Sequence, residues 1–272
     1  MRLCPKSFST RLFSSTSSKL ETYPRPIEHL RNYITKDDIV HDFGSFKLVR
    51  ARLEHVPLLI PTLEDFLKSE PTAQGAEGKK ALLEFTWPFL FNVTRYPYSY
   101  FALNSNDEIV SVALQDVVYK DPTKDPRPRI PIELSNPNDP LNLVGAVLGF
   151  GEHRHFEILG VDRYLHNECA YTPSILRRQR ISSTVYPVVM KLTAEVAARE
   201  GLQYSVGIVT GEANLQNMAK LNYKFLERIP AEIYKDFEGK PWLPKDEKPA
   251  MLITKKISMD LEETSKNGVF EK

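Results

Sequence analysis

The order of hydrophobic and polar positions along the chain predicts short strands and helices in alternation. Residues 46–53 alternate apolar and polar side chains, which is the period of a half-buried strand. An apolar helical pattern covers 79–90, and two apolar runs at 100–103 and 109–114, separated by a polar turn, predict a β-hairpin. Six prolines between 122 and 140 predict a loop, because proline can neither donate to a strand ladder nor continue a helix.

The second half of the chain continues this alternation. Its expected elements are core segments at 144–150 and 167–172, a long helix at 183–200 that Gly201 stops, a strand at 204–210, a short helix at 214–221 and a strand at 250–257. Strands mixed with helices in this order predict one mixed α/β domain. We place this domain at 40–258 and expect a charged tail at 259–272.

Composition fits a folded domain of ordinary size. The 272 residues are 42% hydrophobic and 26% charged, and the formal net charge is +1. That balance gives no basis for nucleic acid or a membrane surface as the main partner. No apolar run approaches the roughly 20 residues that a membrane-spanning helix needs.

The cysteines and histidines predict neither a disulfide framework nor a metal site. Cys4 and Cys169 are too few for either, so a reducing compartment is the expected one. The six histidines form no pair at metal-ligand spacing. His153 and His155 sit in a charged stretch, and we expect both to face solvent.

The first twenty residues differ in composition from the rest of the chain. They are basic and Ser-rich, and no acidic residue precedes Glu21, which is typical of a mitochondrial transit peptide. Arg11-Leu12-Phe13-Ser14 is similar to a processing site, with cleavage expected after Phe13. A plain disordered tail over 1–20 is the alternative.

One acidic residue stands at a predicted helix end. Leu63, Phe66 and Leu67 recur at helical spacing, and Pro71 pushes the residue before it into extended geometry. Glu70 is therefore presented at the end of an amphipathic segment. An exposed helix-end glutamate is the ordinary interpretation, and a catalytic carboxylate is the functional one.

A basic turn precedes the longest predicted helix. Arg177, Arg178 and Arg180 bring positive charge to a helix start, whose unpaired N–H groups suit a pyrophosphate. Ser182 and Ser183 can cap the helix or donate to a phosphate oxygen. A solvated basic turn with a serine cap is the alternative.

Four segments carry a resemblance to a known family. They are Phe66 to Pro71, Ile109 to Leu114, Ala170 to Pro173 with the turn from Arg177 to Ser182, and Met218 to Tyr223. With these segments, residues from about Phe46 to Ile257 resemble the GCN5-related N-acetyltransferase (GNAT) superfamily. In detail they are similar to insect arylalkylamine N-acetyltransferases of the dopamine-acetylating type.

This resemblance implies a fold, a reaction and a set of site residues. The implied fold is a single mixed, mainly antiparallel sheet flanked by helices, in a monomer with no nucleic-acid or membrane partner. The implied reaction is transfer of acetyl from acetyl-CoA to a small primary amine, an arylalkylamine, with Glu70 as general base. The residues implied to bind acetyl-CoA are Ala170, Thr172, Arg177, Arg178, Gln179, Arg180, Ile181, Ser182, Ser183 and Asn214.

The chain departs from the family pattern at a few positions. Arg180 and Ser182 stand where the acetyl-CoA loop has small residues, which let the backbone approach the pyrophosphate. Asn222 replaces a glycine, and Asn tolerates the left-handed conformation best after Gly. The tyrosine that protonates the leaving thiolate in many members has no counterpart, and Met218 falls near its position.

Several interpretations stay open at this point. Cys169 has no base at recognisable spacing, so acetyl transfer would be direct from CoA to the amine. Tyr96, Tyr98 and Tyr100 suit either an amine pocket or the core. The alternatives to an amine acetyltransferase are a mitochondrial acyl-CoA:amino acid N-acyltransferase and a catalytically silent member that binds CoA or a protein.

Overall fold

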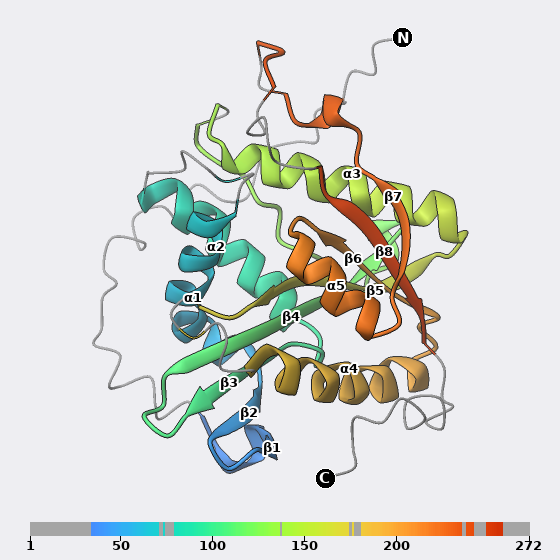
Figure 1. Cartoon of the computed structure of the whole chain (residues 1–272). Helices are drawn as coiled ribbons and strands as arrows, with labels where there is room; N and C mark the ends of the chain where they lie inside the picture. The colour runs from blue at the N-terminus through green and yellow to red at the C-terminus, as the bar shows by residue number, and fades with distance from the viewer. Residues whose placement is uncertain are drawn as a thin grey trace.

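A single eight-stranded sheet with helices on both faces forms the protein (Figure 1). The computed structural model describes residues 34–70, 73, 79–136, 138–173, 176, 181–235, 238–241 and 249–257. The strand order is β1-β2-β3-β4-β5-β6-β8-β7. Within these residues, β5 and β6 pair in parallel and every other neighbouring pair is antiparallel. The predicted mixed, mainly antiparallel sheet is confirmed.

The sheet and helices have the following bounds. The strands are β1 (Ile39–Asp42), β2 (Phe46–Arg50), β3 (Tyr100–Asn104), β4 (Ile109–Tyr119), β5 (Arg163–Tyr171), β6 (Tyr204–Val209), β7 (Lys224–Arg228) and β8 (Met251–Lys256). The α-helices are α1 (Val56–Ser69), α2 (Lys79–Thr94), α3 (Leu141–Leu159), α4 (Ile181–Arg199) and α5 (Glu212–Lys220). Short 3-10 turns lie at Lys36–Asp38, Leu53–His55, Pro122–Lys124 and Ala231–Ile233.

Alternate side chains of the central strands bury against different helices. Val49 of β2 and Phe101 of β3 pack with α1 and α2, while their neighbours Leu48 and Tyr100 pack with α4 on the other face. This period of two is the pattern expected of strands covered on both sides. Tyr100 is buried in the core beneath α4, and Tyr96 and Tyr98 are buried in a separate cluster with Val117 and Leu165. None of the three is among the described residues that line the pocket below.

Some elements differ from the sequence-based expectation. The core segment expected at 144–150 is part of the long helix α3, and β1 and β7 were not predicted. His153 is exposed as expected, but the expectation for His155 was wrong. His155 is fully buried, because it lies on the side of α3 that faces the sheet and packs against Tyr164 of β5.

The proline-rich segment before α3 is a loop that side chains fix to α2. The side-chain amide of Asn92 donates to the carbonyl of Ile130 and accepts from its N–H, at 2.9 and 2.8 Å. Glu84 accepts from the N–H and hydroxyl of Ser135. This segment therefore lies in a defined position beside the sheet.

Two predicted backbone details are confirmed. Gly201 follows α4 with a positive φ of 74°, the left-handed conformation that ends helices. Asn222, which replaces the family's glycine, has a φ of 63°. Asn adopts this region more easily than most side chains, so the turn before β7 keeps its shape.

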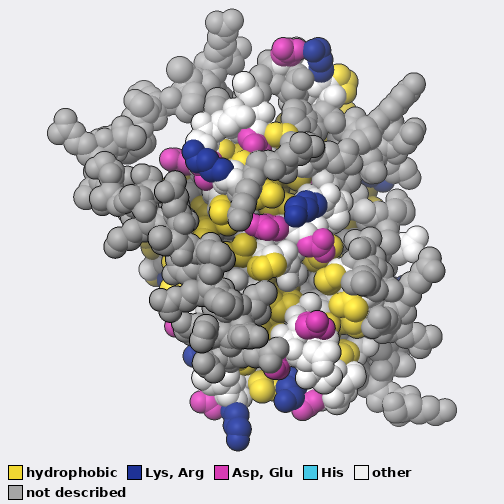
Figure 2. Space-filling view, turned by 90° about the vertical axis from the view of Figure 1, so that its left-hand side faces the viewer, with side chains coloured by type: hydrophobic (Ala, Val, Ile, Leu, Met, Phe, Trp, Pro, Cys, Tyr) yellow, Lys and Arg dark blue, Asp and Glu magenta, His cyan; other side chains and the backbone are white. Residues whose placement is uncertain are grey.

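On the face that carries α1 and α2, acidic and basic side chains are scattered between apolar ones (Figure 2). Of the helices that the structure describes, none combines the length and apolar character needed to cross a membrane.

Candidate active site

Glu70 lies at the C-terminal end of α1 with its side chain turned inward. Its backbone is extended, its N–H donates to the carbonyl of Leu67, and only 7% of the residue is exposed. The hydroxyl of Thr210, directly after β6, donates to Glu70 Oε2 at 3.2 Å. The predicted helix-end position is therefore a buried one, which the ordinary exposed interpretation did not anticipate.

Contacts between α1 and β5 hold this helix end in place. The hydroxyl of Tyr171, the last residue of β5, donates to Asp65 Oδ2 at 2.6 Å. The ring of Phe66 meets the same tyrosine edge-on, with 5.5 Å between ring centroids. Glu70 thus has a fixed position relative to the end of β5.

The strands β5 and β6 separate beside Glu70. The two strands pair with each other from Leu165 and Ser205 to Asn167 and Gly207. Beyond these residues β5 continues to Tyr171 and β6 to Val209, but the two strands no longer pair with each other. A wedge opens between the two strand ends in the middle of the sheet (Figure 1). Backbone N–H and C=O groups along such a wedge are available to a ligand.

A pocket occupies this wedge and the space beneath α1, α2 and α3. Its empty volume is about 860 Å³, including its open mouth. Apolar side chains form most of the wall, and Glu70 and Glu168 are the carboxylates among its described residues. The residues that line it are Leu63, Phe66, Leu67, Glu70, Phe85, Phe89, Val144, Val147, Leu148, Asn167, Glu168, Cys169, Ala170, Gly207, Ile208, Val209, Thr210, Asn214, Met218 and Ile253.

Cys169 lies in the same wall, but its thiol is poorly reactive. Burial raises the pKa of its thiol well above the usual range, and the charges of Glu70 and Glu168 raise it further. A thiol is a poor nucleophile until it ionises. The position of Cys169 therefore favours direct acetyl transfer over an acetyl-cysteine intermediate.

Cys169→Ala is expected to keep the turnover of the parent protein with acetyl-CoA and its best amine acceptor. Loss of a true covalent nucleophile lowers turnover by about 10⁶-fold, because the whole reaction route is removed. Steady-state kinetics would measure this, and mass spectrometry of the protein mixed with acetyl-CoA alone would show no acetyl adduct. A collapse of turnover with an intact fold would contradict the direct route.

The residues predicted to bind acetyl-CoA are only partly brought together. Ala170 and Asn214 line the pocket. Ile181, the first residue of α4, has its side chain in the core between α4 and the sheet, so only its backbone remains for a ligand, and Ser183 is exposed on the first turn of α4. Arg177, Arg178, Gln179 and Arg180 lie outside the described residues.

A row of hydroxyl groups joins β4, β5 and the start of α4. Ser111 Oγ lies 3.0 Å from Thr172 Oγ1, which lies 2.7 Å from Ser182 Oγ. The serine that replaces a small residue of the family's loop is thus directed at the end of β5. Its hydroxyl forms a contact within the protein that glycine could not make.

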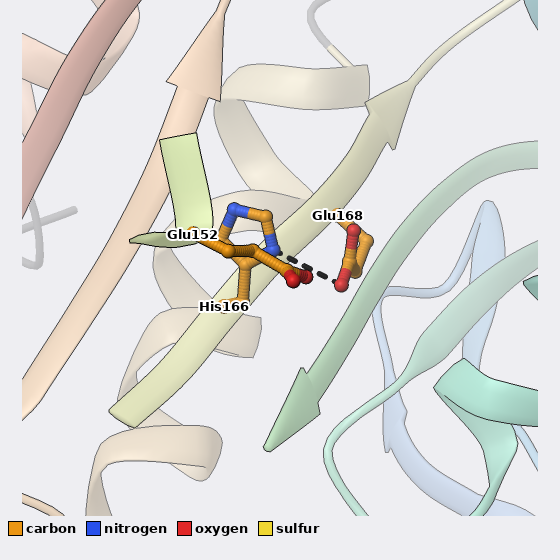
Figure 3. A group of neighbouring side chains, drawn as sticks. All are labelled: Glu152, His166 and Glu168. Carbon is orange, nitrogen blue, oxygen red and sulfur yellow. Dashed lines mark ion pairs between the residues drawn. The ribbon is translucent and has the colours of Figure 1, made fainter. Parts of the chain in front are cut away.

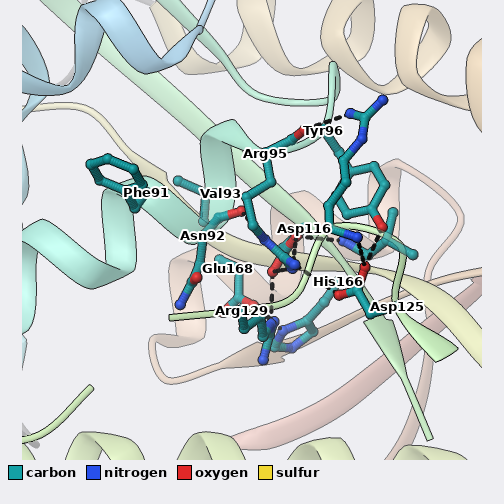
Figure 4. A network of polar contacts seen from close by, with 12 residues as sticks. Phe91, Asn92, Val93, Arg95, Tyr96, Asp116, Asp125, Arg129, His166 and Glu168 are labelled. Atoms are coloured by element: carbon teal, nitrogen blue, oxygen red, sulfur yellow. Dashed lines mark hydrogen bonds and ion pairs between the residues drawn. The ribbon is translucent and has the colours of Figure 1, made fainter. Parts of the chain in front are cut away.

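A buried ionic network lies behind the pocket, and the sequence-based prediction missed it. Arg129, from the proline-rich loop, places Nε 2.8 Å from Asp116 and Nη2 2.8 Å from Glu168 (Figure 4). Its Nη1 lies 2.6 Å from Glu152. Arg95, at the end of α2, bonds both oxygens of Asp116. A carboxylate within a mostly apolar strand, as at Asp116 of β4, is the sequence signal that could have indicated it.

Three members of this network have the spacing of metal ligands. Glu152, His166 and Glu168 each offer a ligand atom, and these atoms lie within 4.8 Å of one another (Figure 3). The Arg129 guanidinium, however, bonds both carboxylates at 2.6 and 2.8 Å. An arginine side chain therefore supplies the cation that these carboxylates require.

The comparisons with known proteins point to one fold. No family model matches the sequence, and no curated protein matches it in sequence. Arylalkylamine N-acetyltransferase 2 from Aedes aegypti superposes with a TM-score of 0.59 at 14% identity, over 79% of this chain and 100% of that one. The Drosophila melanogaster polyamine N-acetyltransferase, which forms N-acetylagmatine, gives 0.59 at 14% identity over 78% and 99%.

A third solved structure matches equally well. The C-terminal condensation domain of Ebony, in complex with β-alanyl-dopamine, gives a TM-score of 0.59 at 16% identity, over 78% of this chain and 99% of that domain. The protein has the fold of the GNAT N-acetyltransferases, and the predicted resemblance is confirmed at that level. The structures it is similar to include insect arylalkylamine N-acetyltransferases.

Proposed function

We propose that the protein is an acetyl-CoA-dependent N-acetyltransferase of a small primary amine, for which the sequence resemblance implies the arylalkylamine class. The observation that carries this proposal is the position of Glu70. A buried carboxylate, with Thr210 as hydrogen-bond donor, lies in the wall of a pocket where β5 and β6 separate. A base, an acceptor pocket and two strand ends that do not pair with each other therefore share one cavity.

In this proposal each group has a defined chemical role. A primary amine is mostly protonated near neutral pH, so Glu70 removes a proton from the ammonium group, directly or through one water. Backbone N–H groups around Ala170 to Thr172 donate to the thioester oxygen as its negative charge develops. The neutral amine nitrogen forms its bond to the acetyl carbon, the C–S bond breaks, and the proton that the nitrogen loses neutralises the leaving thiolate of CoA.

The charges of the pocket favour an amine over an amino acid as acceptor. Its lining contains Glu70 and Glu168, and no Lys, Arg or His is among the described lining residues. The carboxylate of an amino acid would meet like charge there, whereas an ammonium group would meet opposite charge. The acyl-CoA:amino acid alternative has no such support.

The alternative of a catalytically silent member rests on Arg180 and Ser182. Ser182 contacts Thr172 at 2.7 Å, so its hydroxyl is held by the protein's own β5 end. This contact accommodates the serine without directing it at a pyrophosphate. Arg180 lies outside the described residues. The argument for a catalytically silent member therefore depends on Arg180 and no longer on Ser182.

Two measurements on the purified protein test these alternatives together. Calorimetry would measure acetyl-CoA binding, and steady-state assays would compare acetyl-, benzoyl- and longer acyl-CoAs with tryptamine and glycine as acceptors. Turnover of acetyl-CoA with amines but not with glycine supports the proposal. Binding of acetyl-CoA without turnover of any acceptor supports the silent member, and transfer to glycine supports the amino-acid acyltransferase.

We also propose that the protein is imported into mitochondria, because residues 1–20 are basic, Ser-rich and free of acidic residues. The expected result is a mature N-terminus at Ser14 or shortly after it in protein isolated from a mitochondrial fraction. Mass spectrometry of the N-terminal peptide would measure it. An intact Met1 or Arg2 start in the cytosolic fraction would contradict import.

A further inference from the structure

The second carboxylate of the pocket, Glu168, has one oxygen, Oε2, for which the described residues provide no hydrogen-bond donor. The side chain is only 5% exposed, and its Oε1 lies 2.8 Å from Arg129 Nη2 and 3.0 Å from His166 Nδ1. No described residue donates a hydrogen bond to Oε2. Buried carboxylate oxygens are normally hydrogen-bonded, so an unpartnered one in a pocket wall is an acceptor for a ligand.

A bulge in the sheet turns Glu168 toward this pocket. Leu114 of β4 pairs with Cys169, and the next residue, Gln115, pairs with Asn167, so Glu168 has no partner in the ladder. Such an extra residue changes which face a side chain points to. Glu168 and Cys169 therefore both lie on the pocket side, although they are neighbours in the chain.

The surroundings keep Glu168 ionised. Burial alone would raise its pKa, but the charges and hydrogen bonds of His166 and Arg129 lower it to about 2. A carboxylate with so low a pKa is a weak base, and it remains a fixed negative charge at neutral pH. Its properties suit binding of a cation rather than removal of a proton.

Most of the wall of the same pocket is apolar, and its described polar side chains besides the two carboxylates are Asn167, Thr210 and Asn214. Phe66, Phe85, Phe89 and Leu148 are among the side chains that line it together with Glu70 and Glu168. A ligand complementary to this arrangement has an apolar middle and a positive charge at each end. A short alkyl diamine has this chemistry.

We propose that Glu168 binds a second cationic group of the acceptor, so that the acceptor is a short diamine or aminoalkylguanidine rather than an arylalkylamine. Glu70 faces the reacting amine, Glu168 faces the distal cation, and the apolar wall contacts the alkyl chain between them. This inference rests on the proposed function and narrows its substrate class. Glu168 acts in binding, and Glu70 acts in proton removal.

The sharpest test compares two acceptors that differ only in the distal group. 1,4-Diaminobutane and n-pentylamine have the same number of heavy atoms, but only the first has a cation at both ends. A buried charge-assisted hydrogen bond gives the diamine a KM about 10- to 100-fold lower in the parent protein. Equal KM values for the two amines would overturn the proposal while leaving the acetyltransferase function in place.

Two variants distinguish direct contact between Glu168 and the distal cation from a long-range effect of the network's negative charge. Glu168→Gln is expected to bring the ratio of the two KM values close to one, with acetyl-CoA affinity unchanged. Glu152→Gln removes the same charge from the network but does not line the pocket, so it should keep most of the parent's ratio. The ratio is internal to each protein, so a loss of folded protein does not change it. An equal effect of both variants would overturn direct contact.

Direct binding distinguishes failure of this inference from failure of the proposed function. If acetyl-CoA binds and no amine is turned over, the function fails, and calorimetric titration of the CoA-loaded protein with each amine still tests Glu168. Tighter binding of 1,4-diaminobutane than of n-pentylamine, lost in Glu168→Gln, supports the diamine site. Equal or undetectable binding of the two amines overturns it.

Discussion

Glu70→Gln is expected to lower turnover of acetyl-CoA and amine by about 10²–10⁴-fold, the usual contribution of one general base. The substitution keeps the size of the side chain and its ability to accept a hydrogen bond from Thr210. It removes the negative charge that takes the proton from the ammonium group. Acetyl-CoA affinity should change little, because the predicted CoA-binding turn precedes α4 while Glu70 ends α1.

A variant on the same helix gives the matched control. Glu64→Gln makes the same chemical change on α1, at a residue that does not line the pocket. Its turnover should stay close to that of the parent. A rise in turnover of Glu70→Gln with pH, toward the value of the parent, would be consistent with loss of the base, since more of the amine is then already neutral. Unaltered turnover of Glu70→Gln would remove Glu70 from the mechanism.

Arg129→Met is expected to lower the free energy of unfolding by about 3 kcal/mol, the lower end of the cost of leaving buried charges unpaired. Burial alone would lower the pKa of this guanidinium, but the charges of Glu168, Glu152 and Asp116 raise it, so it is a full cation. Its removal leaves Asp116, which is fully buried, with Arg95 alone. For a chain of this size, the melting temperature should fall by roughly 6–12 °C.

Arg154→Met is the control for this second result. Arg154 also bonds two carboxylates, Glu157 and Glu227, but all three side chains are a third or more exposed. Exposed ion pairs contribute about 0–1 kcal/mol, because water solvates the separated charges well. Denaturant melts of the two variants would compare them directly. Similar losses would show that the network behind the pocket is no more stabilising than surface pairs.

The sequence pattern predicted the fold well where the pattern was local. The helix over 183–200, its stop at Gly201 and the hairpin of β3 and β4 follow from periods that neighbouring residues set. The helix α3 was not recognised as one element, because the sequence pattern indicated only a core segment at 144–150, which lies in its first half. The edge strands β1 and β7 were missed because they are short and largely exposed, so their alternation is weak.

The candidate site was predictable only in part, for a physical reason. The position of Glu70 at a helix end was predictable from the proline that follows it, because this signal lies in neighbouring residues. Glu168 depends on a one-residue bulge between β4 and β5, and on Arg129 reaching back from a loop 39 residues earlier. Pairing of this kind is decided by tertiary packing, and no window of neighbouring residues contains it. The burial of His155 was missed for the same reason.

The connection between β4 and β5 is a segment through which the specificity of the pocket for its ligand could change in evolution. These two strands are neighbours, yet the chain between them forms the proline-rich loop and α3, which supply Val144, Val147 and Leu148 to the pocket and Arg129 to the network. The entropic cost of a longer connection rises slowly, by about 0.6 kcal/mol for each doubling of length. Substitutions or insertions in this one segment can therefore reshape the acceptor wall while Glu70 and the wedge stay unchanged. In the proposed enzyme, the acceptor wall and the CoA-binding turn before α4 would belong to parts of the chain that can evolve separately.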